Sequence, residues 1–245
     1  HVSAAVVWGL PILGAWPPEV HTLVASASGG RSGRGIRRHC VELDLVRSTV
    51  LDNLRVTSVE RTLIDLARTL SFASAVMAFD HALATDRGRK SPMTTKSRIL
   101  AELEHVGWSR GRNRVLTVVA FADGASGSPG ESLSRVRIFE LGFPAPCLQA
   151  EFVHHTGIRD FADFDWPDYE HLGEFDGHGK YLDPRMRAGL SPDQIVIAEK
   201  RREDRLRTRR AHFTRWEWGD ALQPARLLAI LVDAGLPRTG IRTFS

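Results

Sequence analysis

Cysteine is scarce in this sequence of 245 residues, which contains only Cys40 and Cys147. Two thiols cannot build a disulfide framework or a multi-cysteine zinc site. Such sparse use is typical of proteins that work in a reducing interior. The sequence therefore predicts a cytoplasmic protein in which both cysteines are core or incidental residues.

Long apolar runs are also missing. The most apolar opening stretch, residues 2–16, is interrupted by Gly9, Pro11 and Gly14 and is shorter than the ~20 residues that a membrane-spanning helix needs. It lacks the basic flank and cleavage site of a signal peptide, so we expect a buried helix and no membrane partner. The chain starts at His1 rather than Met, which suggests that an upstream segment is absent from it.

Nucleotide-binding and local metal motifs are absent as well. No GxGxxG follows a predicted strand, and residues 174–181 lack the first glycine and the final Ser or Thr of a P-loop. The pair His154-His155 lacks the spacing of two metal ligands on a helix, which favours a turn over a zinc site. The function therefore has to be sought in other residues.

Arginine gives the chain its basic character. The formal net charge is only +4, but the basic residues concentrate in segments 31–38, 110–114 and 200–215. Guanidinium groups present a planar fork of donors that suits phosphate oxygens. The last segment favours nucleic acid as a partner over a merely solvated helix face.

A segment of small and turn-forming residues, 123–130, divides the chain. We predict a smaller α+β module over 1–122, a linker over 123–130 and a second α/β module over 131–245 with a mixed sheet flanked by helices. Before the linker, hydrophobic periodicity predicts a helix over 2–13, strands within 35–54 and helices from Ser58 and over 71–84, 94–105 and 112–121. After it we expect a helix capped by Ser128, strands over 147–153, 158–165, 170–176 and 213–218, and helices from Ser191 and over 224–235.

Two acidic pairs fall in predicted strands of the second module. Residues two apart in a strand share a face, which pairs Asp163 with Asp165, and Glu174 with Asp176. If the two strands are neighbours, Asp163 and Glu174 converge, with their carboxylates roughly 4–6 Å apart around one ion. Oxygen ligands of this kind indicate Mg²⁺ or Mn²⁺, and a solvated sheet face is the alternative.

The same residues resemble the PD-(D/E)XK nuclease superfamily. The similarity extends over about residues 128–235 and is strongest to the Vsr-like endonuclease-domain proteins of actinobacteria, which implies a restriction-endonuclease-like sheet. Residues 1–122 resemble AbiEi-type antitoxins without their winged-helix start. The motifs that carry the resemblance are Glu131-Ser-Leu-Ser-Arg, Asp163-Phe-Asp-Trp-Pro, Glu174-Phe-Asp-Gly-His-Gly-Lys-Tyr181, Glu199-Lys-Arg-Arg-Glu-Asp-Arg-Leu-Arg207, Arg215-Trp-Glu-Trp218, His1-Val-Ser-Ala-Ala and Val56-Thr-Ser-Val-Glu-Arg-Thr-Leu-Ile-Asp65.

The resemblance assigns site residues. Asp163 and Glu174 match the metal-binding acids, and Glu131 matches the acid on the first helix. Glu131 could equally complete a capping box with Ser128. The lysine expected two residues after the second acid is replaced by Asp176. Either Lys180 or Lys200 substitutes for it, or Asp176 is a third metal ligand whose ion lowers the pKa of the attacking water.

The resemblance implies a Mg²⁺-dependent DNA endonuclease of the defence or repair type. Gln149, Arg201, Arg202 and Arg205 would then grip the DNA backbone, with Arg201, Arg205 and Arg202 as a row of phosphate contacts. The alternative is a catalytically inactive nuclease fold that acts as a DNA-binding antitoxin or transcriptional regulator of a type IV toxin–antitoxin system, with a cognate toxin as partner. A structural interaction module without nucleic acid is a third hypothesis.

Overall fold

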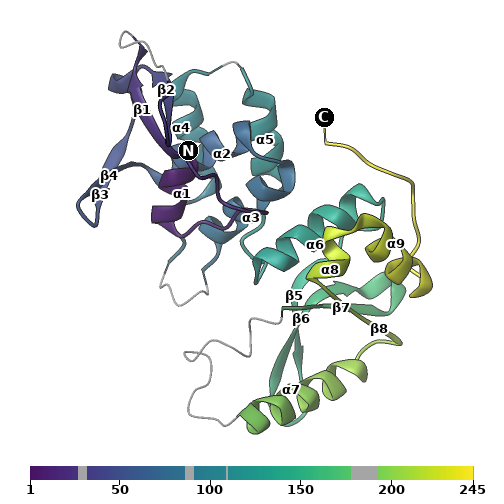
Figure 1. The fold of residues 1–245 in the computed structure, drawn as a ribbon. Helices are drawn as coiled ribbons and strands as arrows, with labels where there is room; N and C mark the ends of the chain where they lie inside the picture. The colour runs from purple at the N-terminus through teal and green to yellow at the C-terminus, as the bar shows by residue number, and fades with distance from the viewer. Residues whose placement is uncertain (27–31, 86–90, 109, 178–191, 245) are drawn as a thin grey trace. The chain divides into compact units, whose positions relative to one another are not determined.

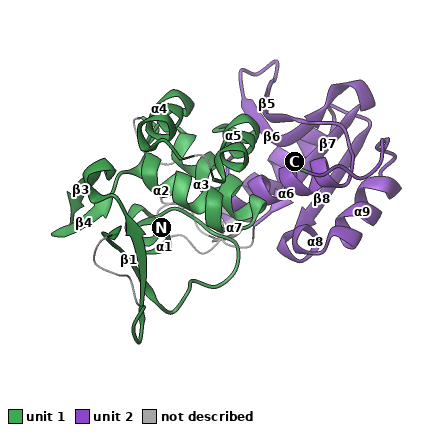
Figure 2. Cartoon of the chain, turned by 90° about the horizontal axis from the view of Figure 1, so that it is seen from above, with its two compact units in different colours: residues 1–125, 244–245 green, residues 126–243 purple. Residues whose placement is uncertain are grey.

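A computed structural model describes residues 1–26, 32–85, 91–108, 110–177 and 192–244 (Figure 1). The chain forms two compact units, residues 1–125 with 244–245 and residues 126–243 (Figure 2). The division falls inside the segment of small residues that the sequence marks as a linker. Within the described ranges, no helix is long and apolar enough to cross a membrane.

Unit 1 is built around one buried helix. Helix α2 has buried side chains at every position from Val59 to Ala67, and it packs against α1, α3, α4 and α5. Serine or threonine caps begin three of these helices, because their hydroxyls accept a free N–H of the first turn. The helices are α1 (Val2–Trp8), α2 (Val59–Thr69), α3 (Phe72–Leu83), α4 (Lys96–Val106) and α5 (Arg112–Phe121).

Two small sheets complete this unit. Strands β1 (Val20–Ala25) and β2 (Ile36–Val41) pair in parallel, and β3 (Ser48–Leu51) and β4 (Leu54–Thr57) form an antiparallel hairpin. Strand β1 was not expected from the sequence. The helix predicted over 2–13 ends at Trp8, because Gly9 takes a left-handed conformation with φ 67° that terminates a helix. Cys40 and Cys147 are both exposed, so neither is a core residue.

Unit 2 contains a mixed sheet of four strands in the order β5-β6-β7-β8. The first three strands are antiparallel neighbours, and β8 returns parallel to β7 after a helix. In Figure 1, α6 lies on one side of this sheet and α7 on the other. The predicted fold class is confirmed. The elements are α6 (Pro129–Glu140), β5 (Cys147–Val153), β6 (Arg159–Trp166), β7 (His171–Asp176), α7 (Pro192–Arg207), β8 (His212–Glu217), α8 (Trp218–Leu222) and α9 (Pro224–Asp233).

Aromatic rings fill the α6 side of the sheet. Phe164 stacks on Trp216 with ring centroids 5.2 Å apart, and the Trp216 indole N–H donates to Ser134 of α6 at 2.8 Å. Gly173 leaves the space that these rings need, because a Cβ there would lie 2.6 Å from the Trp216 ring. On the α7 side, Ala162 and Leu172 pack against Leu206, and the partly buried Phe152 and Phe213 pack against these residues. The sheet is therefore covered on both faces.

Strands β6 and β7 part at Asp163. Their pairing covers Phe164 to Trp166 and stops there. Ala162 packs on the α7 side whereas Phe164 packs on the α6 side, so the alternation of side chains is broken between them. This break puts polar groups at the point where the strands separate.

Candidate active site

The amide of Gln149 joins two buried carboxylates. Its Nε2 donates to Glu131 Oε2 at 2.9 Å and to Asp163 Oδ1 at 3.1 Å. Glu131 and Asp163 are 3% and 6% exposed. Gln149 has φ 47°, a left-handed conformation that is uncommon for a residue with a side chain, and it lies at a gap in the β5–β6 pairing between Leu148 and Ala150. Glu131, Gln149 and Asp163, here named the acid bridge, thus bring three elements together.

The second oxygen of Asp163 reaches into the gap between the strands. Asp163 Oδ2 accepts a hydrogen bond from the Phe175 backbone N–H at 2.9 Å. A carboxylate here takes the place of a backbone carbonyl, so it satisfies an N–H that would otherwise be buried without a strand partner. This contact fixes Asp163 at the end of the paired segment.

Helix α6 positions Glu131. Ser128 caps the helix by accepting the Glu131 backbone N–H at 3.1 Å. The Glu131 carboxylate accepts from Gly127 N–H at 2.7 Å rather than from Ser128, so the predicted capping box is only half present. The other role proposed for Glu131 is compatible with this position, because its carboxylate also contacts the Gln149 amide. Helix capping and a place in the acidic cluster therefore coexist in one side chain.

Glu174 has a different partner. Arg202 of α7 donates to both of its oxygens, Nη1 to Oε1 at 3.2 Å and Nη2 to Oε2 at 2.6 Å. The same guanidinium also donates to Glu199 and to the Phe161 carbonyl. Burial alone would lower the pKa of Arg202, but its hydrogen bonds to Glu199 and Glu174 outweigh burial and raise it. Arg202 is therefore a fixed cation that holds Glu174 against α7.

Three further acids of the sheet lie beside arginines. Arg205 makes a bidentate contact with Asp160, at 2.6 and 2.7 Å. Arg210 does the same with Asp165 at 3.0 Å for both bonds. Arg215 lies 3.5 Å from Asp176. Each of these carboxylates therefore has a guanidinium beside it.

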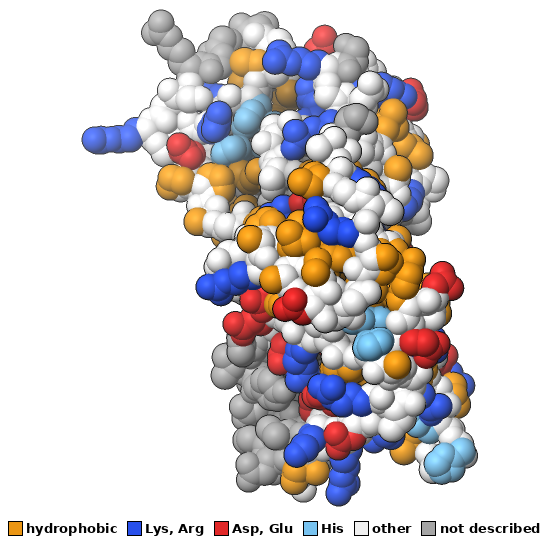
Figure 3. All heavy atoms as spheres, turned by 90° about the vertical axis from the view of Figure 1, so that its right-hand side faces the viewer, with side chains coloured by type: hydrophobic (Ala, Val, Ile, Leu, Met, Phe, Trp, Pro, Cys, Tyr) orange, Lys and Arg blue, Asp and Glu red, His pale blue; other side chains and the backbone are white. Residues whose placement is uncertain are grey.

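These ion pairs involve two members of the predicted phosphate row, whose DNA contacts stay a prediction. Arg202 and Arg205 point toward acids of the sheet, because residues three apart share a helix face and that face packs on β6 and β7. Arg201 and Lys200 are exposed. Toward the lower end of Figure 3, where α7 lies, Lys and Arg side chains are interspersed with Asp and Glu. Of the three arginines predicted to contact phosphates, Arg201 is exposed, whereas Arg202 and Arg205 are partly buried.

The other predicted site residues have separate outcomes. Lys180 lies outside the described residues. Gln149 belongs to the acid bridge, a role that the sequence did not indicate. What distinguishes Gln149 is its left-handed backbone conformation, which no sequence motif marks. The 4–6 Å approach of the Asp163 and Glu174 carboxylates, roughly what a shared ion requires, stays a prediction. The two acids lie on neighbouring strands, where Asp163 accepts from Gln149 of β5 and Glu174 accepts from Arg202 of α7.

Comparisons with known proteins give limited guidance. No protein-family model matches the chain, and no solved structure matches it. Two curated Mycobacterium tuberculosis proteins, MT2308 of strain CDC 1551 / Oshkosh and Rv2248 of strain ATCC 25618 / H37Rv, are each 31% identical over 119 residues. Both are named only as uncharacterized proteins. The match covers 47% of this chain and 40% of each relative, so the chain spans less than half of their length.

Proposed function

We propose that this chain is a Mg²⁺-dependent DNA endonuclease, with its site at the acid bridge. The observation that carries the proposal is the convergence of the Glu131 and Asp163 carboxylates on one amide group where β6 and β7 part. Glu174 follows on the facing strand. The mixed sheet covered by α6 and α7 supports the same proposal, because the nuclease resemblance implies such an arrangement.

The donor atoms fit a hard divalent cation. Carboxylate and amide carbonyl oxygens are the protein ligands that Mg²⁺ accepts. Asp163 and Glu131 would hold the ion, and Glu174 would join them by exchanging one oxygen from its ion pair with Arg202. The Gln149 side chain carries an amide oxygen as well as the nitrogen that now bridges Glu131 and Asp163. When bound, the ion would polarise a phosphate and lower the pKa of a water molecule.

The chain's own residues would bind and orient the substrate. Lys200 and Arg201 are exposed on α7, directly before the arginine that holds Glu174. Cations at these positions can contact phosphates without disturbing the ion pairs below them. Arg202 is a positioning residue in this proposal, because it fixes the Glu174 carboxylate.

Plasmid cleavage with Mg²⁺ tests the proposal. Asp163→Asn should abolish cleavage, because it removes a negative oxygen ligand at nearly constant volume. Asp168→Asn, at an exposed acid on the turn after β6, is the matched control and should cleave normally. Cleavage that survives both Asp163→Asn and EDTA would reject this site. Failure of the unmutated protein to cleave any DNA or RNA would reject the endonuclease.

A second candidate function has its own observation. Arg215 lies beside Asp176, and that acid occupies the position where the nuclease resemblance implies a lysine. This favours an inactive nuclease fold that binds DNA as an antitoxin or regulator, with a toxin as partner. Its signature would be DNA binding without cleavage. Arg201→Ala should then weaken binding across sequences and reduce the salt dependence by a slope of about 0.9 for one lost phosphate contact.

A further inference from the structure

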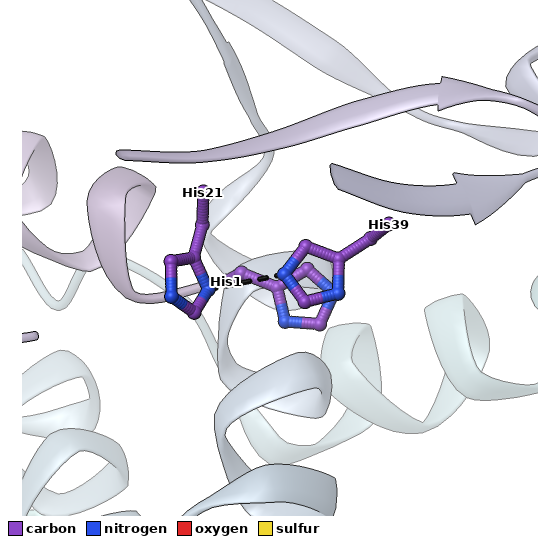
Figure 4. Close-up of side chains that lie close together, drawn as sticks. All are labelled: His1, His21 and His39. Atoms are coloured by element: carbon purple, nitrogen blue, oxygen red, sulfur yellow. Dashed lines mark hydrogen bonds between the residues drawn. The ribbon is translucent and has the colours of Figure 1, made fainter. Parts of the chain in front are cut away.

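Three histidines that are far apart in the sequence meet in unit 1. His1 precedes α1, His21 lies on β1 and His39 lies on β2 (Figure 4). Each offers a ring nitrogen, and these nitrogens all lie within 4.8 Å of one another. The three residues, here named the histidine cluster, belong to neither of the proposed functions, which rest on unit 2.

The parallel pairing of β1 and β2 produces the cluster. Leu23 is opposite His39, and His21 lies two residues before Leu23, so both histidines project from the same face of this small sheet. Ser3 of α1 accepts the His21 backbone N–H at 2.8 Å and docks the helix against β1. That contact places His1 over the same face.

The ring geometry is close to that of ligands around one ion. His39 Nε2 and His21 Nδ1 are 3.0 Å apart and share a hydrogen bond, which a bound ion would replace. Two nitrogens bound to a tetrahedral zinc ion at 2.0–2.1 Å are separated by about 3.3 Å. The His1 ring stacks on His39 with centroids 3.6 Å apart, so it has to turn about its side-chain bonds to direct a lone pair at the same point.

A second observation also indicates a ligand. His21 Nε2 is buried and has no hydrogen-bond partner among the residues that the structure describes. Buried polar atoms rarely lack a hydrogen bond. When an ion binds one ring nitrogen of a histidine, the second ring nitrogen usually donates a hydrogen bond to a neighbouring group or a water molecule. The cluster is thus incompletely satisfied by the protein alone.

Burial disfavours protonation of the His21 and His39 rings. Burial is the largest cause that lowers the pKa of both His21 and His39. His21 also lowers the pKa of His39, and Arg37 lowers both, whereas Glu19 opposes this at His21 and Asp65 at His39. Neutral imidazoles have the lone pairs that metal binding needs.

We propose that His1, His21 and His39 form a binding site for one divalent transition-metal ion of the Zn²⁺ class. Three imidazoles suit zinc, copper or nickel rather than Mg²⁺, because nitrogen donors favour softer ions. Three protein ligands leave a fourth position of a tetrahedron open to water or another small ligand. The site is independent of the acid bridge in both its donors and its preferred metal.

Calorimetric titration of the full chain with Zn²⁺ tests the proposal, and Co²⁺ absorption reports the coordination. We expect one ion per chain and the intense visible bands of tetrahedral Co²⁺. His21→Ala and His39→Ala should each weaken binding at least ~100-fold, because even the loss of an outer partner of a metal ligand costs about 10–100-fold. Circular dichroism identifies a variant that fails to fold, in which case His39→Gln replaces it.

Two control variants separate this site from others. His105→Ala removes an exposed histidine of the same unit and should leave Zn²⁺ affinity unchanged. Cys40→Ser removes the thiol next to His39 and should also leave it unchanged. Absence of binding, or unchanged affinity in both His21→Ala and His39→Ala, would reject the site and leave a stacked histidine core. Loss of binding in Cys40→Ser would replace it by a thiolate site.

Discussion

The ion pair between Glu174 and Arg202 makes a prediction that bears on both stability and activity. Glu174 is 3% exposed, and the side chain of Arg202 is 22% exposed. Replacing either residue by alanine leaves its partner's charge in a largely buried place. A substitution that removes a proposed metal ligand will therefore also destabilise unit 2.

The size of the effect follows from burial. Breaking a wholly buried pair by removing one partner costs about 3–5 kcal/mol. Arg202 is partly exposed and keeps Glu199 and the Phe161 carbonyl, so Glu174→Ala should cost less, about 2–3 kcal/mol after allowance for solvent screening. Arg202→Ala should cost about 3–4 kcal/mol, because Glu174 stays buried. The double variant should cost less than the sum of the two.

Urea denaturation followed by amide hydrogen exchange of β6 and β7 measures the change in unit 2 alone. A probe confined to this unit is needed because a chain with two units need not unfold in one step. The matched control is the pair Glu151–Arg159, which joins β5 and β6 at 2.9 Å with side chains 38% and 66% exposed. Its disruption should cost less than about 1 kcal/mol.

Two results would refute this reasoning. Glu174→Ala could prove no more destabilising than Glu151→Ala, or the costs of Glu174→Ala and Arg202→Ala could simply add in the double variant. Either outcome would mean that the pair contributes little to the fold. Glu174→Gln, measured in both stability and cleavage assays, then distinguishes loss of a metal ligand from loss of structure.

Three further predictions concern unit 2. The hydrogen bond from Arg205 lowers the pKa of Asp160, so this carboxylate stabilises the fold at neutral pH, and the contribution is lost as the pH falls below about 4. The urea midpoint of Asp160→Asn should be lower than that of the unmutated protein at pH 7, and the two midpoints should become equal at strongly acidic pH. Burial lowers the pKa of His171 to about 4, so the unfolded chain binds this proton first, and stability should fall on the order of 2–3 kcal/mol as the pH decreases from 6.5 to 4. An equally steep decline in His171→Gln would assign the slope to other groups. Gly130→Ala puts a Cβ 2.0 Å from the Phe175 ring. This overpacking should cost about 1–3 kcal/mol and lower the melting temperature. A higher melting temperature, which is the usual result of Gly→Ala in a helix, would contradict the tight contact.

Local signals in the sequence determined most of the secondary structure. The predicted bounds of α5 and β5 coincide with the observed ones, and Ser128 caps α6 as expected. Caps, turns and hydrophobic periods act over a few residues, so they can be recognised without a partner. Strand β1 was missed because its stability depends on parallel pairing with β2, which follows only after intervening residues.

The sequence also placed the acids on the correct strands, but it could not give their partners. The arginines that face Glu174 and Asp160 lie 28 and 45 residues further along the chain, and α7 presents them only after it has packed on the sheet. Gln149 joins Glu131 to Asp163 through a left-handed backbone that no local pattern announces. The three histidines meet because a helix and two strands fold onto one another. Residue type and local pattern thus fixed which groups are available, while long-range packing decided which of them touch.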